Sequence, residues 1–125
     1  MVLLENFFKI LKEEKGINED FFYLQLNSEH EIYQVHFPNN PITPGVCLLQ
    51  ILKEIVKKYY FNSESITITS VKNIKFINPI NPLENNIIMY QINFNIIENS
   101  AIINSTVFDE YKEKTFVKMK LEIKK

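Results

Sequence analysis

The spacing of apolar and polar residues predicts one long helix, one short helix and a set of strands. Between residues 2 and 14, leucine, phenylalanine and isoleucine recur at helical spacing and predict a short amphipathic helix. Residues 44–60 repeat that spacing and predict a long helix with one buried face. Residues 32–35 are expected to form a brief extended segment. Five segments rich in β-branched and aromatic residues are expected to form strands, namely 21–27, 65–76, 87–97, 101–108 and 115–123.

The order of these elements predicts an α+β fold in which an antiparallel sheet wraps around the long central helix. The chain has 125 residues, of which 46% are hydrophobic, so we expect one domain over residues 1–125 with a substantial core. The net charge of −1 gives no basic field for nucleic acid. A single cysteine excludes an internal disulfide and suggests a reducing, cytoplasmic setting. Residues 1–11 include Glu5 and Lys9, and indicate neither a signal peptide nor a membrane span.

The most informative stretch runs from His36 to Glu54. Its three prolines each fix φ and remove a backbone donor, so residues 37–44 are expected to form a stiff loop. Thr43 is a suitable N-cap, and Pro44 suits the first turn of the long helix. A helix N-terminus has free N–H groups and a positive dipole end, which can hold a carbonyl oxygen as negative charge develops on it.

Residues 36–46 read His-Phe-Pro-Asn-Asn-Pro-Ile-Thr-Pro-Gly-Val. This stretch resembles the signature of the hotdog-fold 3-hydroxyacyl-acyl-carrier-protein dehydratases, His-Phe-Pro-Gly-x-Pro-x-x-Pro-Gly-Val, then three variable residues and an acid. Residues 72–82 are similar to that family's next block, an aromatic-bearing strand that ends in Pro-x-x-Pro-Gly-Asp, with Leu83-Glu84 in place of the Gly-Asp. The resemblance extends from about residue 20 to the C-terminus, with the expected N-terminal helix common to the family as well, and it implies a hotdog fold. Two departures stand out: Asn39 replaces a glycine, and Gln50 replaces the catalytic acid.

The resemblance also implies roles for individual residues in removing water from a 3-hydroxyacyl thioester, in fatty acid or related polyene or polyketide synthesis. His36 would be the base, and the N–H of Gly45 or Val46 would hold the thioester oxygen. Phe37 and Pro44 would contact the substrate. In the family the acid comes from the facing subunit, so the resemblance implies a homodimer or an oligomer of dimers. The substrate would be carried on acyl carrier protein or CoA, and we expect neither a cofactor nor a metal.

Gln50 leaves four interpretations open, because an amide cannot give up a proton at neutral pH. In the first, His36 makes both proton transfers and Gln50 only positions the hydroxyl or a water. In the second, Glu54 replaces the acid, although it lies one turn away, about 5.4 Å along the helix. In the third, the protein is a hotdog thioesterase. In the fourth, the site is inactive and the protein binds acyl chains or serves as an assembly subunit.

Other residues have weaker claims to a role. Cys47 lies in the first helical turn, where a thiolate would be favoured, but we interpret it as a small buried hydrophobe. His30 lies in a polar turn and is expected to be solvent-exposed. The apolar side chains expected to line an acyl tunnel are Phe37, Leu48, Leu49, Ile51, Phe76 and Ile80. The basic side chains that could meet an acidic carrier protein are Lys57, Lys58, Lys72 and Lys75.

Overall fold

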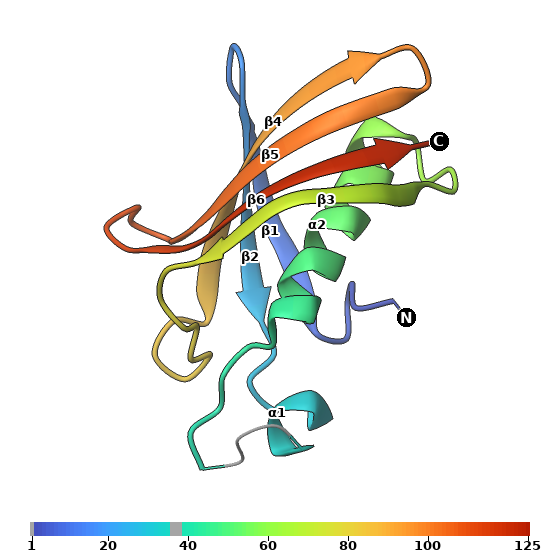
Figure 1. Ribbon diagram of the computed structural model, residues 1–125. Coiled ribbons are helices and arrows are strands. Elements are labelled where there is room, and N and C mark those ends of the chain that lie inside the picture. Colours follow the sequence, from blue (N-terminus) through green and yellow to red (C-terminus); the bar gives the residue numbers. More distant parts are fainter. Residues whose placement is uncertain (1, 36–38) are drawn as a thin grey trace.

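The computed structural model describes residues 2–35 and 39–125, which form a six-stranded antiparallel sheet and two helices (Figure 1). Helix α2 (Gly45–Tyr60) lies against the sheet, and the short helix α1 (Glu31–Val35) lies beyond the N-terminal end of α2. The spatial order is β1-β2-β4-β5-β6-β3, and every neighbouring pair is antiparallel. The strands are β1 (Phe8–Lys15), β2 (Asp20–Leu26), β3 (Thr67–Phe76), β4 (Ile87–Ile97), β5 (Ser100–Asp109) and β6 (Thr115–Lys124). The expected α+β fold, a sheet wrapped around a long helix, is confirmed.

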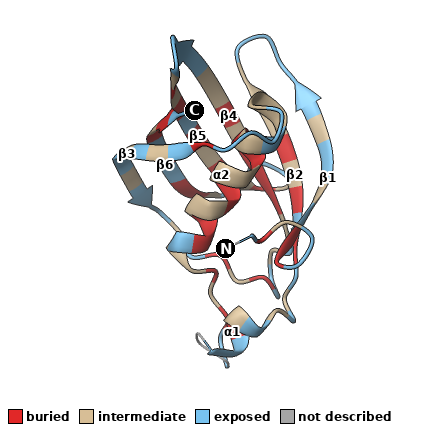
Figure 2. Cartoon of the chain, turned by 90° about the vertical axis from the view of Figure 1, so that its right-hand side faces the viewer, coloured by how far each residue is buried: buried red, intermediate tan, exposed pale blue. Residues whose placement is uncertain are grey.

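The core lies between the buried face of α2 and the inner face of the sheet, as the burial colours in Figure 2 show. Residues on one side of α2 recur at spacings of three and four, so they form a continuous apolar stripe. Those facing the sheet are Cys47, Leu48, Ile51, Leu52, Ile55 and Val56. In strands β5 and β6, buried residues alternate almost strictly with half-buried or exposed ones, which places one apolar face against the helix. The core therefore fixes α2 across the curved sheet.

The N-terminal prediction was wrong: residues 2–14 do not form a helix. Residues 8–15 form β1, which pairs with β2 with a register shift between Ile10 and Lys12. The preceding residues form a turn in which the Leu3 carbonyl accepts the N–H of Asn6 and of Phe7. The apolar spacing fits either structure, and a helix of this length is marginal by itself. Pairing with β2 supplies the backbone partners that decide in favour of the strand.

The prediction for residues 32–35 was also wrong, because they belong to α1. His30 Nδ1 accepts the N–H of Ile32 at 3.1 Å and caps the start of this helix, while the Asn27 side chain accepts the N–H of Glu29 in the turn before it. The His30 ring also lies edge-on to Phe7, with centroids 5.2 Å apart. His30 is therefore half-buried and supports α1, not solvent-exposed as expected.

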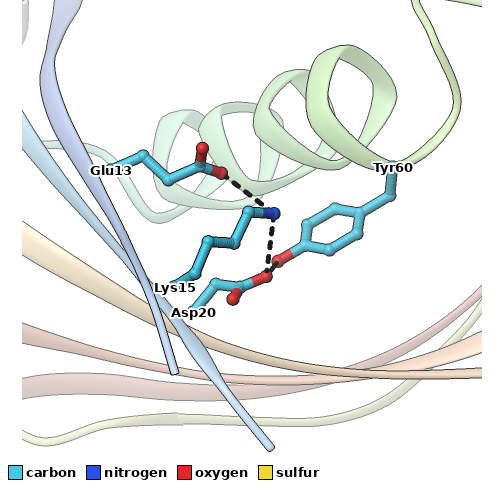
Figure 3. Close-up of polar contacts among 4 residues, drawn as sticks. All are labelled: Glu13, Lys15, Asp20 and Tyr60. Carbon is cyan, nitrogen blue, oxygen red and sulfur yellow. Dashed lines mark hydrogen bonds and ion pairs between the residues drawn. The ribbon is translucent and has the colours of Figure 1, made fainter. Parts of the chain in front are cut away.

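A polar cluster fastens the C-terminal end of α2 to the first hairpin (Figure 3). Tyr60, the last residue of α2, donates its hydroxyl to Asp20 at the start of β2. Lys15 Nζ lies 3.5 Å from the same Asp20 carboxylate and 3.4 Å from Glu13 Oε2. Burial, and then the nearby Asp20 carboxylate, raise the pKa of Tyr60. The hydroxyl is therefore held protonated, and the cluster is a structural anchor far from the N-terminal end of the helix.

Candidate functional site

An apolar cleft of about 440 Å³ opens at the N-terminal end of α2. One wall is the loop before α2 with the first helical turn, and the other is the end of β3 with the loop that follows it. The Thr43 N–H donates to the Ile80 carbonyl at 2.8 Å and joins the two walls. The lining residues are Ile42, Thr43, Pro44, Gly45, Leu48, Phe76, Ile77, Asn78, Pro79 and Ile80. The cleft therefore combines an apolar surface with the start of a helix.

Gly45 allows the ring of Phe76 to lie directly against the start of α2. A Cβ at position 45 would be 2.6 Å from Phe76 Cζ and 2.9 Å from Cε1, closer than carbon atoms can approach. The Phe76 side chain is nevertheless 61% exposed, so the ring is covered on one side only. The close approach of the ring therefore depends on the absence of a Cβ at position 45, and the exposed ring forms part of the cleft wall.

In the described part of the chain, the first two N–H groups of α2 have no hydrogen-bond acceptor. Pro44 precedes the helix with extended backbone, and no side chain caps the helix start. The Pro44 carbonyl accepts the N–H of Cys47 at 3.0 Å, whereas among the described residues no acceptor lies against the N–H of Gly45 or Val46. These two groups are the donors that the sequence predicted for a thioester oxygen.

The expected N-cap role of Thr43 was wrong, because its hydroxyl bonds elsewhere. Thr43 Oγ1 and the Tyr33 hydroxyl lie 2.8 Å apart, and both residues are buried. The Tyr33 ring stacks on Phe7, with centroids 5.2 Å apart, and burial raises the pKa of its hydroxyl. This pair joins α1 to the loop before α2. In the sequence, Tyr33 precedes His36, the predicted base, and Thr43 follows it.

Cys47 is buried, as the sequence indicated, and burial raises the pKa of its thiol. Because burial disfavours the thiolate, the first-turn position does not make this cysteine a nucleophile. One turn of α2 is also held from the sheet side: the Tyr90 hydroxyl donates to the Leu48 carbonyl at 2.8 Å. Cys47 and Leu48 both lie on the core side of the helix, so their packing stabilises the wall of the cleft.

Gln50 and Glu54 lie one turn apart on the side of α2 that faces away from the sheet. Gln50 Nε2 donates to Glu54 Oε2 at 2.9 Å. The Glu54 carboxylate also accepts the backbone N–H of Leu3 and of Leu4, at distances of 2.8 to 3.0 Å. Glu54 is therefore occupied by three donors, which argues against its acting as the missing acid.

The structure brings together only part of the predicted site. Gly45, Pro44, Leu48, Phe76 and Ile80 line the cleft. The Val46 side chain points away and is 65% exposed, and neither Leu49 nor Ile51 belongs to the cleft wall. His36 and Phe37 lie outside the described residues. Sequence analysis missed the part of the wall formed by Ile42, Asn78 and Pro79, although the prolines of residues 77–82 signalled a loop there.

Two further observations bound the chemistry of the described residues. Within residues 2–35 and 39–125, no three His, Cys, Asp or Glu side chains form a group that could hold a metal ion. In the same ranges, none of the helices has the length and apolar character that crossing a membrane requires.

Comparison of folds places the chain among hotdog proteins. A chain of the dehydratase heterocomplex ApeI:P from Xenorhabdus doucetiae superposes with a TM-score of 0.72 at 18% identity, covering 94% of this chain and 97% of that one. An uncharacterized protein from Erwinia carotovora gives a TM-score of 0.70 at 20% identity, covering 91% and 93%. A hypothetical thioesterase from Streptococcus pneumoniae, solved with coenzyme A, gives 0.66 at 7% identity, covering 94% and 84%. At these identities the likeness shows the hotdog fold.

Comparison of sequences identifies the family. A comparison with curated protein sequences found no significant match. The sequence profile of the ApeI-like family, described as ApeI dehydratase, matches residues 12–116. This span covers most of the chain, from the middle of β1 to the second residue of β6, and includes the cleft and Gln50. The chain therefore belongs to the ApeI-like dehydratase family.

Proposed function

We propose that this protein is a 3-hydroxyacyl-thioester dehydratase that forms the trans-2-enoyl thioester, in fatty acid or related polyene or polyketide synthesis. The observation that carries the proposal is the apolar cleft at the start of α2, in a chain of the ApeI-like dehydratase family. The acyl chain lies along the apolar wall. The thioester oxygen accepts the N–H of Gly45 or Val46, where the helix dipole favours the negative charge that develops on it.

The reaction breaks the C2–H and C3–O bonds and forms the C2–C3 double bond. His36 takes the C2 proton, and the electron pair of that bond moves toward the thioester carbonyl. The enolate then expels the 3-hydroxyl, which leaves as water after receiving a proton from the imidazolium. Because His36 returns the proton that it took, the cycle needs no second acid. General acid help is typically worth about 10²–10⁴-fold, so we expect slower turnover than with a carboxylic acid at position 50.

We further propose that the protein works as a dimer with a second hotdog chain, so that Gln50 serves the cleft of the facing subunit. Strand β3 lies at an edge of the sheet and exposes the apolar side chains of Val71 and Phe76, which is compatible with such a partner. The similar ApeI:P dehydratase from Xenorhabdus doucetiae is a heterocomplex. An acyl carrier protein would deliver the substrate, and the exposed Lys75, next to Phe76, is a basic residue suited to an acidic carrier.

A thioesterase is the second candidate, because thioesterases share the fold and position 50 carries no acid. One experiment separates the two functions. The purified protein is incubated with a 3-hydroxyacyl thioester, on CoA and on carrier protein, and the products are followed by mass spectrometry and by release of free thiol. A dehydratase gives a thioester lighter by one water with no free thiol. Release of thiol without loss of water contradicts the proposal and favours the thioesterase.

A further inference from the structure

Asn78 brings a polar side chain into the wall of the apolar cleft. Among the described residues that line the cleft, the polar side chains are those of Thr43 and Asn78. The Thr43 hydroxyl is buried and lies 2.8 Å from the Tyr33 hydroxyl, so it already has a partner inside the protein. Asn78 is half-buried. Of the two, Asn78 is therefore the side chain that can bind a polar group of a ligand.

The Asn78 amide is held in place by β6. Its Nδ2 donates to the Thr115 carbonyl at 2.9 Å. Its backbone N–H donates to the Phe116 carbonyl at 3.2 Å, and the same carbonyl accepts the N–H of Ile77 at 2.8 Å. The chain thus stays bonded to β6 beyond the end of β3, and two consecutive residues of β6 hold both the backbone and the side chain of Asn78.

The loop after Asn78 is also fixed. Pro79 restricts the backbone, because its ring sets φ near −65°. The Ile80 side chain is 1% exposed, and the Ile80 carbonyl accepts the N–H of Thr43 at 2.8 Å. Asn78 therefore lies between two anchors, one to β6 and one to the loop before α2, and its amide is oriented before a ligand binds.

The contact with β6 determines which end of the amide is left for a ligand. A backbone carbonyl only accepts hydrogen bonds, so the NH₂ group of Asn78 must face Thr115. Thr115 does not belong to the cleft wall, and the nitrogen is thus turned out of the cleft. In the described part of the chain, no donor bonds Asn78 Oδ1. The cleft therefore offers a hydrogen-bond acceptor at this point.

We propose that Asn78 is a substrate-binding residue, whose Oδ1 accepts an amide N–H of the pantetheine arm that carries the acyl group. The inference rests on the proposed function, in which the substrate is a thioester of CoA or of a carrier protein. Both carriers present the same arm, which has two amide N–H groups, whereas an acyl chain and a thioester have none. A single polar group in an apolar cleft fixes the orientation of a ligand, so this contact would select pantetheine thioesters over those of simple thiols.

The first test measures binding of an unreactive ligand. Butanoyl-pantetheine with CH₂ in place of its sulfur has no 3-hydroxyl to lose and no thioester bond to hydrolyse. Its ester analogue, in which oxygen replaces both amide N–H groups, keeps the shape but donates no hydrogen bond from the arm. By NMR titration, the wild type should bind the amide form about threefold to tenfold more tightly than the ester form, the difference expected for one net hydrogen bond. A wild type that binds both forms equally, or neither, would overturn the inference.

Substitution of Asn78 shows whether this preference comes from its side chain. Asn78→Leu keeps a similar shape and removes both polar ends, and Asn78→Ala tests the same loss without the bulk of leucine. In both variants the preference for the amide form should fall to within about twofold. Asn93→Leu is the matched control, because Asn93 Nδ2 also donates to a backbone carbonyl, that of Asn18 at 3.1 Å, but lies outside the cleft wall. It should keep the wild-type preference. An unchanged preference in the Asn78 variants would contradict the proposed contact.

The second test uses dehydration and separates failure of the inference from failure of the proposed function. For 3-hydroxybutanoyl-pantetheine, Asn78→Leu should raise KM about threefold to tenfold with kcat nearly unchanged, because the contact lies away from the reacting bonds. For the ester analogue of this substrate, the KM of the wild type and of Asn78→Leu should agree. A preference that depends on Asn78 in a protein without dehydration would support the contact and overturn the dehydratase assignment. Dehydration with an equal KM in wild type and Asn78→Leu would keep the assignment and overturn the role of Asn78.

Discussion

Substitution of Gly45 by alanine tests whether substrate occupies the start of α2. The added methyl carbon would lie 2.6 Å from Phe76 Cζ. Carbon atoms pack best at about 3.5–4.0 Å, so the ring must move by about 1 Å or more. The Phe76 side chain is 61% exposed, so it can move without opening the core. The substitution therefore reshapes the cleft more than it strains the fold.

The stability change should be small and the kinetic change large. In a helix, alanine is more favourable than glycine by at most about 1 kcal/mol, and by less at the first position. This difference in helix propensity offsets part of the strain from the contact with Phe76. We expect the free energy of unfolding in urea to stay within about 1 kcal/mol of wild type. A displacement of about 1 Å at a reacting group can cost about 10²-fold, so kcat/KM for a 3-hydroxyacyl thioester should fall by about that factor.

Two further variants locate the cause. Ile17→Ala removes an apolar side chain that is 99% exposed in the turn between β1 and β2, outside the cleft wall, and should leave kcat/KM close to wild type. In Gly45→Ala/Phe76→Ala the clash is gone, and we expect at least about a tenfold recovery over Gly45→Ala. Wild-type kcat/KM in Gly45→Ala would refute the placement of the thioester at this helix end.

Three other predictions follow from buried groups. Burial raises the pKa of the Cys47 thiol, so a thiol reagent at neutral pH should modify it slowly in the folded protein and fast in urea; fast labelling of the native protein would contradict its burial. Tyr33→Phe leaves the buried Thr43 hydroxyl without its partner and should lower the free energy of unfolding by about 1–3 kcal/mol, measured by urea denaturation; an unchanged midpoint would refute this tether. Burial raises the pKa of Tyr33, Tyr60 and Tyr90, so above pH ~10 the unfolded state loses protons that the folded state keeps. The contribution of these three groups to stability is fully present below that pH and is lost above it, so the urea midpoint should fall as the pH rises above ~10; a midpoint that does not fall there would contradict this.

Much of the fold could be predicted from the sequence because its patterns are long and consistent. The long helix was expected from residue 44 to 60 and begins at Gly45, and the strand expected at residues 87–97 has those bounds. The N-terminal segment was misread because Leu3, Phe7 and Phe8 are buried in either structure, and only pairing with β2 decides between them. A short apolar segment has too few residues to distinguish the helical period of about 3.6 residues from the strand period of about 2.

The site was harder to predict because its contacts join distant parts of the chain. The sequence identified Gly45 and Gln50 by resemblance, but the ring that Gly45 admits comes from residue 76. The partners that fix Glu54 come from residues 3 and 4, in a segment that was expected to be helical. Neither contact has a local signature, because each depends on how the sheet wraps around α2. Gln50 is the exception: its chemical difference from an acid could be read directly.

The most direct test of the central claim is the hydration of a crotonyl-type enoyl thioester, the reverse reaction, followed by loss of ultraviolet absorbance. Wild type, His36→Ala and His30→Asn are compared on CoA and carrier-protein thioesters. In the control, the asparagine oxygen can still accept the Ile32 N–H that His30 caps. We predict hydration by wild type and by His30→Asn, and none by His36→Ala. Equal rates in His36→Ala, or an inert wild type on both carriers, would contradict the dehydratase assignment.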